Sequence, residues 1–304
     1  MSDPVVGVTD RRASRRSGRS RAAWVPLAYL APAALLYGAF LLFPLGRAAQ
    51  FSFFEWDGLG QSTFVGFGNY IALVQDEQLR EAFLHAFVLI FFYAVLPLAI
   101  GLLLAALLTR AQVRGLGFFR TIIFLPQVIA MVVVAVTWRQ IYAPDGPLNG
   151  FLRAIGLGDL ARPWLGDYTF TLPAVGLIGS WVSLGLVTVL LMAGMSRIPP
   201  ELYESARIDG AGPFQEFFAI TLPSVRGEIT VALTLTIVAA LKTFDLIYVT
   251  TSGGPGTSTT VPSYEVYRRA FQLGEVGAAT AVGVALTIVV FAINFVVNRI
   301  GDKK

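Results

Sequence analysis

The sequence predicts an all-α integral membrane protein, built as a bundle of six membrane-spanning helices. Hydrophobic residues make up 55% of the 304 residues and charged residues only 14%, and the mean hydropathy is +0.67. Soluble domains carry about 25% charged residues, so this chain has too little polar surface for a particle in water. Six apolar windows are each long enough, at about 1.5 Å per residue, to cross a hydrocarbon core of about 30 Å.

The six windows divide the chain into three parts. We expect a basic disordered cytoplasmic tail over 1–23, a transmembrane domain over 24–298 and a short cytoplasmic C-terminus over 299–304. The predicted spans are 24–46, 82–108, 121–138, 172–193, 229–250 and 278–298. The second window would be about 40 Å long as a helix, so we expect it to tilt or to extend beyond the membrane.

The distribution of basic residues predicts the orientation. Of the 23 Lys and Arg residues, 15 lie in the two ends and in the segments 109–120 and 194–228, whereas seven lie in the alternate segments 47–81, 139–171 and 251–277. Because cytoplasmic segments carry the excess of positive charge, both termini are expected in the cytoplasm. Six arginines crowd the tail 1–23, which favours contact with anionic membrane lipid over nucleic acid.

Residue types that carry covalent or metal chemistry are scarce. The chain has no cysteine and one histidine, His85, which excludes thiolate metal sites, Cys nucleophiles and His-based metal clusters. No Gly-Lys pair occurs, so the chain lacks the end of a P-loop that would hold nucleotide phosphates. We therefore expect no enzyme, no metal site and no cofactor in this chain.

The segment 197–223, between the fourth and fifth windows, reads as two short helices. Proline suits the first turn of a helix, carboxylates are favoured at the N-terminal end, and glycine favours the stop. The residues in these places are Pro199, Pro200, Glu201 and Glu204 at the first start, Gly210 and Gly212 at the stop, and Pro213 and Pro223 at the start and end of the second helix. By itself this predicts an amphipathic helix pair on the cytoplasmic face, a pattern that a plain connector shows as well.

The spacing within this segment resembles a known motif. Three residues separate Glu204-Ser205-Ala206 from Gly210, and nine residues separate Gly210 from Ile220-Thr221-Leu222-Pro223. This is similar to the EAA motif in permease subunits of binding-protein-dependent ABC importers, with Ser205 where the family usually has alanine. The resemblance implies a coupling helix that inserts into a groove on a cytoplasmic ATPase. The implied coupling residues are Glu201, Glu204, Ser205, Ala206, Asp209, Gly210, Ala211, Ile220, Leu222 and Pro223.

Roles within the segment follow from the same resemblance. The carboxylates of Glu201, Glu204 and Asp209 would make polar contacts with the ATPase, and Gly210 would allow the tight turn. Leu222 and Pro223 would anchor the segment to the fifth span.

Further resemblance points to the carbohydrate-uptake branch of these permeases, the branch of maltose and glycerol-phosphate importers. The passages that carry it are Phe64-Val-Gly-Phe-Gly-Asn-Tyr70, Gly146-Pro-Leu-Asn149 with Trp164-Leu165, and the run from Phe244 to Thr260. The resemblance implies alternating access in a bacterial-type plasma membrane. The implied partners are a second homologous permease, two copies of a cytoplasmic ABC ATPase that binds ATP and Mg, an extracytoplasmic solute-binding protein, and a sugar or sugar-like solute.

Polar and aromatic residues in the spans are candidates for the solute path, because ionisable groups in the membrane are costly. Lys242 and Asp245 lie three apart on one helical face and can neutralise each other, so a structural ion pair and a role in the path both remain open. Phe244 and Tyr248 offer either a platform for sugar rings or a packing contact. Three further candidates, for which helix packing is the alternative, are Trp181, Ser183 and Asn294.

Two other classes of function compete with an ABC importer permease. A secondary transporter or channel that works without an ATPase would be expected to carry carboxylates or histidines deep in its spans, and only Asp245 approaches that description. An integral-membrane enzyme would need a nucleophile, metal set or cofactor motif, and none is visible in the sequence.

Overall fold

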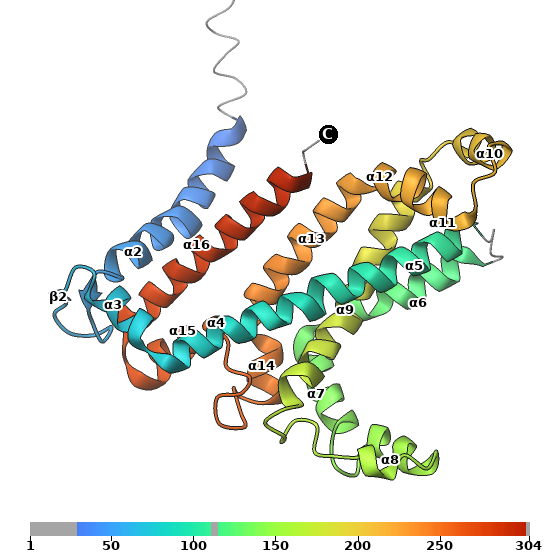
Figure 1. Ribbon diagram of the computed structural model, residues 1–304. Coiled ribbons are helices and arrows are strands. Elements are labelled where there is room, and N and C mark those ends of the chain that lie inside the picture. Colours follow the sequence, from blue (N-terminus) through green and yellow to red (C-terminus); the bar gives the residue numbers. More distant parts are fainter. Residues whose placement is uncertain (1–28, 111–114, 302–304) are drawn as a thin grey trace, which may run out of the picture. The chain divides into compact units, whose positions relative to one another are not determined.

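A computed structural model describes residues 29–110 and 115–301, and these are helical almost throughout (Figure 1). The predicted tail 1–23 and residues 302–304 of the predicted C-terminus lie outside the described residues. The chain divides into two compact units, Met1–Gln50 and Phe51–Lys304. In the first unit, the described residues belong to one helix, Tyr29–Phe51, which includes the π-helical turn η1 (Gly38–Leu42) and α2 (Phe43–Phe51).

The second unit holds the remaining helices and one short strand pair, in which β1 and β2 run antiparallel with Phe54 opposite Phe64. In chain order the elements are β1 (Phe54–Glu55), β2 (Thr63–Phe64), α3 (Gly68–Gln75), α4 (Glu77–Ile90), η2 (Phe91–Val95), α5 (Leu96–Arg110), α6 (Leu116–Val128), α7 (Met131–Ile141), α8 (Pro147–Ala154), η3 (Gly158–Leu160), α9 (Thr171–Met195), α10 (Pro200–Ile208), α11 (Pro213–Glu216), η4 (Phe217–Thr221), α12 (Leu222–Ser224), α13 (Arg226–Leu241), α14 (Asp245–Thr250), α15 (Pro262–Tyr267), η5 (Arg268–Leu273) and α16 (Val276–Gly301).

The described helices confirm an all-α membrane protein. Four are long and apolar enough to cross a membrane: Tyr29–Phe51, Glu77–Thr109, Thr171–Met195 and Val276–Gly301. Two bent pairs raise the number to six if each pair is one span: Leu116–Val128 with Met131–Ile141, and Pro213–Ser224 with Arg226–Leu241. The architecture therefore agrees with the six predicted spans.

Four spans differ in detail from the sequence windows. The first continues to Phe51, five residues beyond the end of its window. The second begins at Glu77, five residues before its window, because Asp76 caps the helix by accepting a hydrogen bond from the Leu79 amide (3.2 Å). The window 121–138 contains a bend of 96° between α6 and α7, where Ile129 has an extended backbone. The window 229–250 contains a break after Leu241, and the helix resumes as α14 at Asp245.

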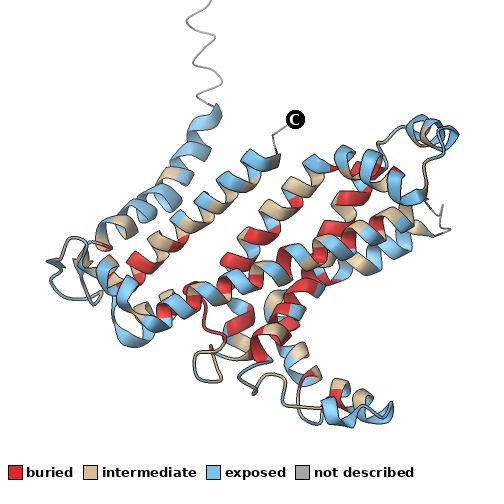
Figure 2. Cartoon of the chain, in the orientation of Figure 1, coloured by how far each residue is buried: buried red, intermediate tan, exposed pale blue. Residues whose placement is uncertain are grey.

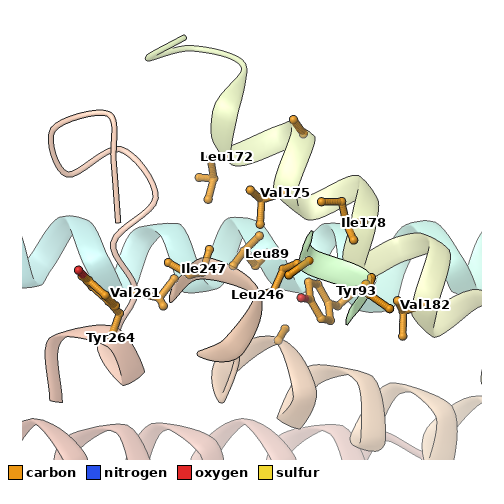
Figure 3. Packing of buried hydrophobic residues seen from close by; sticks show 14 of the residues in the cluster. Leu89, Tyr93, Leu172, Val175, Ile178, Val182, Leu246, Ile247, Val261 and Tyr264 are labelled. Carbon is orange, nitrogen blue, oxygen red and sulfur yellow. The ribbon is translucent and has the colours of Figure 1, made fainter. Parts of the chain in front are cut away.

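Helix α9 lies at the centre of the packing, where Figure 2 shows the densest run of buried residues. Its most apolar window is 67% buried, whereas the windows of the other three long helices are 0 to 28% buried. It contacts α5, α6, α13 and η2. Figure 3 shows the adjoining cluster, in which Val175, Ile178 and Val182 of α9 meet Leu89, Tyr93 and the α14 residues Leu246 and Ile247.

Glycines of α9 let neighbouring helices approach closely. A Cβ atom at Gly179 would lie 1.9 Å from the Tyr93 ring, and one at Gly176 would lie 2.5 Å from the Phe92 ring. The Ser180 hydroxyl donates to the Phe92 carbonyl across the same contact (2.5 Å). In lipid there is no hydrophobic driving force between helices, so small residues that allow close packing and interhelical hydrogen bonds hold the helices together.

We expect Gly179→Ala to lower the melting temperature of the purified protein in mild detergent, because overpacking costs about 1–3 kcal/mol. The matched control is Gly227→Ala in α13, where no atom lies within 4 Å of the new Cβ. That control should be neutral or stabilising by up to about 1 kcal/mol, from the higher helix propensity of alanine. Equal melting temperatures for the two variants would contradict the assigned packing.

Candidate functional site

The segment 197–223 forms the two helices that its prolines and glycines predict. Helix α10 begins at Pro200, with Glu201 in its first turn. A new helix starts at Pro213 and continues through α11, η4 and α12 toward α13. Figure 1 shows α10 and α11 side by side near the ends of α5 and α6.

The turn after α10 depends on Gly210. Its φ of +83° lies in the left-handed region, which glycine adopts without strain. The Gly210 amide donates to the Arg207 carbonyl (3.0 Å) and the Ala211 amide to the Ala206 carbonyl (2.9 Å), the pair of bonds that defines a Schellman stop. No atom lies within 4 Å of a Cβ at this position, so backbone conformation and not crowding requires the glycine.

Side chains tie the two helices of the segment to each other. The Arg207 guanidinium donates through Nε to Glu216 Oε1 (2.8 Å), with the Glu216 side chain 3% exposed and that of Arg207 62% exposed. The hydrogen bond to Glu216 and the charge of its carboxylate raise the pKa of Arg207 above its ordinary value. The Tyr203 and Thr221 hydroxyls lie 2.9 Å apart, which joins α10 to η4. The sequence interpretation named none of these four residues as a functional residue.

The predicted coupling residues lie together in this segment, and most reach solvent. Those that are exposed are Glu201, Glu204, Ser205, Asp209, Gly210 and Pro223, and those that are half-buried are Ala206, Ala211, Ile220 and Leu222. Two apolar side chains that the sequence interpretation passed over are the most prominent: Ile208 is 87% exposed and Phe214 is 82% exposed. Together with the carboxylates they form a mixed polar and apolar surface of the kind that protein partners bind.

The break between α13 and α14 carries the predicted ionisable pair. Lys242 and Asp245 are both exposed, and across residues 29–110 and 115–301 no ion pair joins them. Both line a cavity of about 340 Å³, together with Tyr93, Met131 and Phe244. The structural ion pair is therefore not formed here, and the charges are left facing open space at a helix break.

The aromatic pair Phe244 and Tyr248 belongs to a longer row of rings. Their ring centroids lie 5.3 Å apart at an interplanar angle of 17°. Tyr267 packs edge-on against Tyr248 (5.2 Å), and Phe271 lies 5.5 Å from Tyr267. We call Phe244, Tyr248, Tyr267 and Phe271 the aromatic row. Tyr267 and Phe271 were not predicted, although their spacing of four residues is the signal that could have found them.

The remaining path candidates lie on two helices, α9 and α16. Trp181 is 39% exposed and packs edge-on against Trp138 (5.6 Å), whereas Ser183 is buried in α9. Asn294 lies in α16, where its Nδ2 donates to the Val290 carbonyl (2.8 Å). His85 Nδ1 lies 2.9 Å from the Thr260 carbonyl oxygen, so the chain's one histidine joins α4 to the loop before α15. In the described part of the chain, no group of three or more His, Cys, Asp or Glu could hold a metal ion.

Comparison with known proteins identifies the chain's family. Residues 98–303 match the family described as binding-protein-dependent transport system inner membrane component. The chain belongs to this family. The match begins inside α5 and continues through the coupling segment, the helix break and α16.

Relatives of this inner membrane component include proteins named for sugar uptake. A probable ABC transporter permease protein of Bacillus subtilis is 37% identical, over 89% of this chain and 93% of the relative. A diacetylchitobiose uptake system permease protein of Streptomyces coelicolor is 35% identical, over 90% of this chain and 82% of the relative. A crystal structure of a bacterial ABC transporter that imports the acidic polysaccharide alginate matches with a TM-score of 0.77 at 26% identity, over 93% of this chain and 98% of that chain.

We expect Gly210→Val to lower uptake by the assembled transporter at least about fivefold. The left-handed conformation costs an ordinary L-residue about 1–2 kcal/mol, and each 1.4 kcal/mol is a factor of ten. Gly210→Asn is the matched control, because asparagine is enriched in this conformation, and it should keep most of the uptake. Both variants should insert normally, as measured by their amounts in the membrane fraction. Unchanged uptake by an inserted Gly210→Val variant would contradict the assignment of Gly210 to the turn of the coupling segment.

Proposed function

We propose that this chain is the transmembrane permease subunit of an ATP-driven importer for a sugar or sugar-like solute, delivered by an extracytoplasmic binding protein. One observation carries the proposal: an exposed helix, α10, is fastened through Arg207 and Glu216 to the segment that leads into α13. Helix α13 in turn ends at the break lined by Lys242, Phe244 and Asp245. A push on α10 therefore has a mechanical route to the solute path.

The coupling step needs an ATPase partner on the cytoplasmic side. We assign α10 to a groove on that partner, with Ile208 as an apolar contact and Glu201, Glu204 and Asp209 as polar contacts at the rim. The partner holds ATP and Mg, and this chain holds no cofactor. Closing of two ATPase copies on ATP would displace α10, and α13 would carry the displacement to the helix break.

The solute path would be formed by the helix break and the aromatic row. Sugar rings stack their C–H faces on aromatic surfaces. The hydroxyl groups of a sugar accept hydrogen bonds from an ammonium such as that of Lys242 and donate hydrogen bonds to a carboxylate such as that of Asp245. The names of the diacetylchitobiose and alginate relatives support a carbohydrate as the solute. Trp181, Ser183 and Asn294 are kept as weaker candidates for contacts along the path.

The assembly around this chain contains three further kinds of subunit. A second, homologous permease would supply the other half of the path, two copies of an ABC ATPase would bind from the cytoplasm, and a solute-binding protein would dock on the opposite side. The solved alginate transporter in complex with a pentasaccharide-bound periplasmic protein supports the last of these. We place both termini in the cytoplasm and the chain in a bacterial plasma membrane.

Purification of the tagged chain from its native cells in mild detergent tests the assembly. We expect a P-loop ATPase and a second six-span permease to co-purify. Uptake should require ATP and persist when a protonophore collapses the membrane potential. Recovery of the chain alone and well folded, with uptake abolished by the protonophore, would favour an ATPase-independent secondary transporter instead.

We expect Tyr248→Ala to slow solute uptake about fivefold, the equivalent of about 1 kcal/mol of lost ring contact. Tyr248→Phe should keep most of the rate, since it retains the ring. Phe291→Ala is the control for loss of an exposed aromatic ring elsewhere, because Phe291 is an exposed residue of α16. If Tyr248→Ala and Phe291→Ala leave uptake equally unchanged, the aromatic row is not part of the path.

A further inference from the structure

Two adjoining cavities lie where the end of α5 meets the coupling segment. The first is an apolar groove of about 600 Å³, lined on one side by α5 residues including Ala99, Leu103 and Leu107, and on the other by Phe214 and Phe218. Leu103, Leu107 and both phenylalanines are exposed to it. The groove is concave and lined by apolar side chains, the kind of surface that holds an apolar ligand.

The second cavity measures about 480 Å³ and has a lining of mixed polarity. Beside apolar residues such as Met195 and Ile198, it offers the hydroxyl groups of Thr109 and Tyr203, one carboxylate and one guanidinium. The Thr109 hydroxyl is buried and has no hydrogen-bond partner among the described residues. Ala106 of α5 lines both cavities, so the two cavities adjoin at this residue.

One wall of the groove belongs to the second span. Ala99, Leu103 and Leu107 belong to Glu77–Thr109, a 33-residue helix apolar enough to cross a bilayer. The segment Pro213–Ser224 is bent by 67° from α13, so it inclines away from the span direction and forms the second wall of the groove. In the proposed orientation this place is the cytoplasmic edge of the hydrocarbon, where acyl chains and phosphate headgroups meet.

We infer that these cavities hold one phospholipid of the cytoplasmic leaflet, with an acyl chain in the apolar groove and the headgroup in the second cavity. Arg207 would bind the phosphate. The inference rests on the cytoplasmic orientation proposed above. A lipid in this place contacts both α5 and the segment that follows α10, so it would set how far the coupling segment can move relative to the second span.

Photocrosslinking in membranes tests the inference on the assembled transporter. The probe is phosphatidylethanolamine with a diazirine in its acyl chain, incorporated before solubilisation, and the crosslinked peptides are mapped by mass spectrometry. We expect crosslinks concentrated on residues 99–107 and 213–218. Ala99→Trp, which fills the groove, should lower them about fivefold, whereas Ala292→Trp should leave them unchanged, because Ala292 is an equally exposed alanine of α16.

The mapping on the wild-type chain decides the matter even if Ala99→Trp assembles poorly. Crosslinks spread evenly over exposed span residues such as Ile288 and Phe291, or an absence of crosslinks from the groove, would overturn the inference. The readout does not depend on transport. Concentrated crosslinks in a chain without ATP-driven uptake would therefore refute the proposed function and leave the lipid site standing, and the reverse result would do the opposite.

Discussion

Close packing of α9 against its neighbours is the constraint on which the second unit depends. Lipid gives helices no hydrophobic reason to associate, so contact must come from backbones that approach closely and from interhelical hydrogen bonds. Gly176 and Gly179 admit the rings of Phe92 and Tyr93, and Gly185 admits the α6 backbone, since a Cβ there would lie 2.3 Å from the Ile123 carbonyl oxygen. The π-helical turn η2 and helix α6 are thereby fixed to one central helix, which α5 and α13 also contact.

That central helix also fixes the coupling segment at both of its ends. The segment leaves α9 at Met195 and enters α13 at Arg226, and an ion pair between Arg197 and Glu228 joins these two points. Helix α13 has 16 residues, about 24 Å at the usual rise, and ends at the break lined by Lys242 and Asp245. The predicted ATPase contacts and the predicted solute path are thus connected through the bend before Arg226 and then along α13.

Local signals explain what could be predicted from the sequence. Proline fixes the backbone at its own position and glycine allows a left-handed turn there. Pro200, Gly210 and Pro213 therefore identified both helices of the coupling segment and the turn between them. The break at Lys242–Phe244 has no such signal, because the run Ala240–Leu246 contains neither residue, and it was included in a continuous span. The Arg207–Glu216 contact and the extension of the aromatic row to Tyr267 and Phe271 depend on how separate elements pack, which spacing within one element does not reveal.

Single-cysteine labelling tests most directly whether α10 is a cytoplasmic contact for an ATPase, because the natural chain has no cysteine to interfere. Ile208→Cys lies at the exposed end of α10, and Leu59→Cys, at a residue 95% exposed, serves as the control for the opposite side. In spheroplasts, an impermeant maleimide should label Leu59→Cys and leave Ile208→Cys unlabelled. Inside-out membranes should label Ile208→Cys only after the ATPase has been stripped away. Labelling of Ile208→Cys from outside, or equal labelling of inside-out membranes with and without the ATPase, would contradict the account.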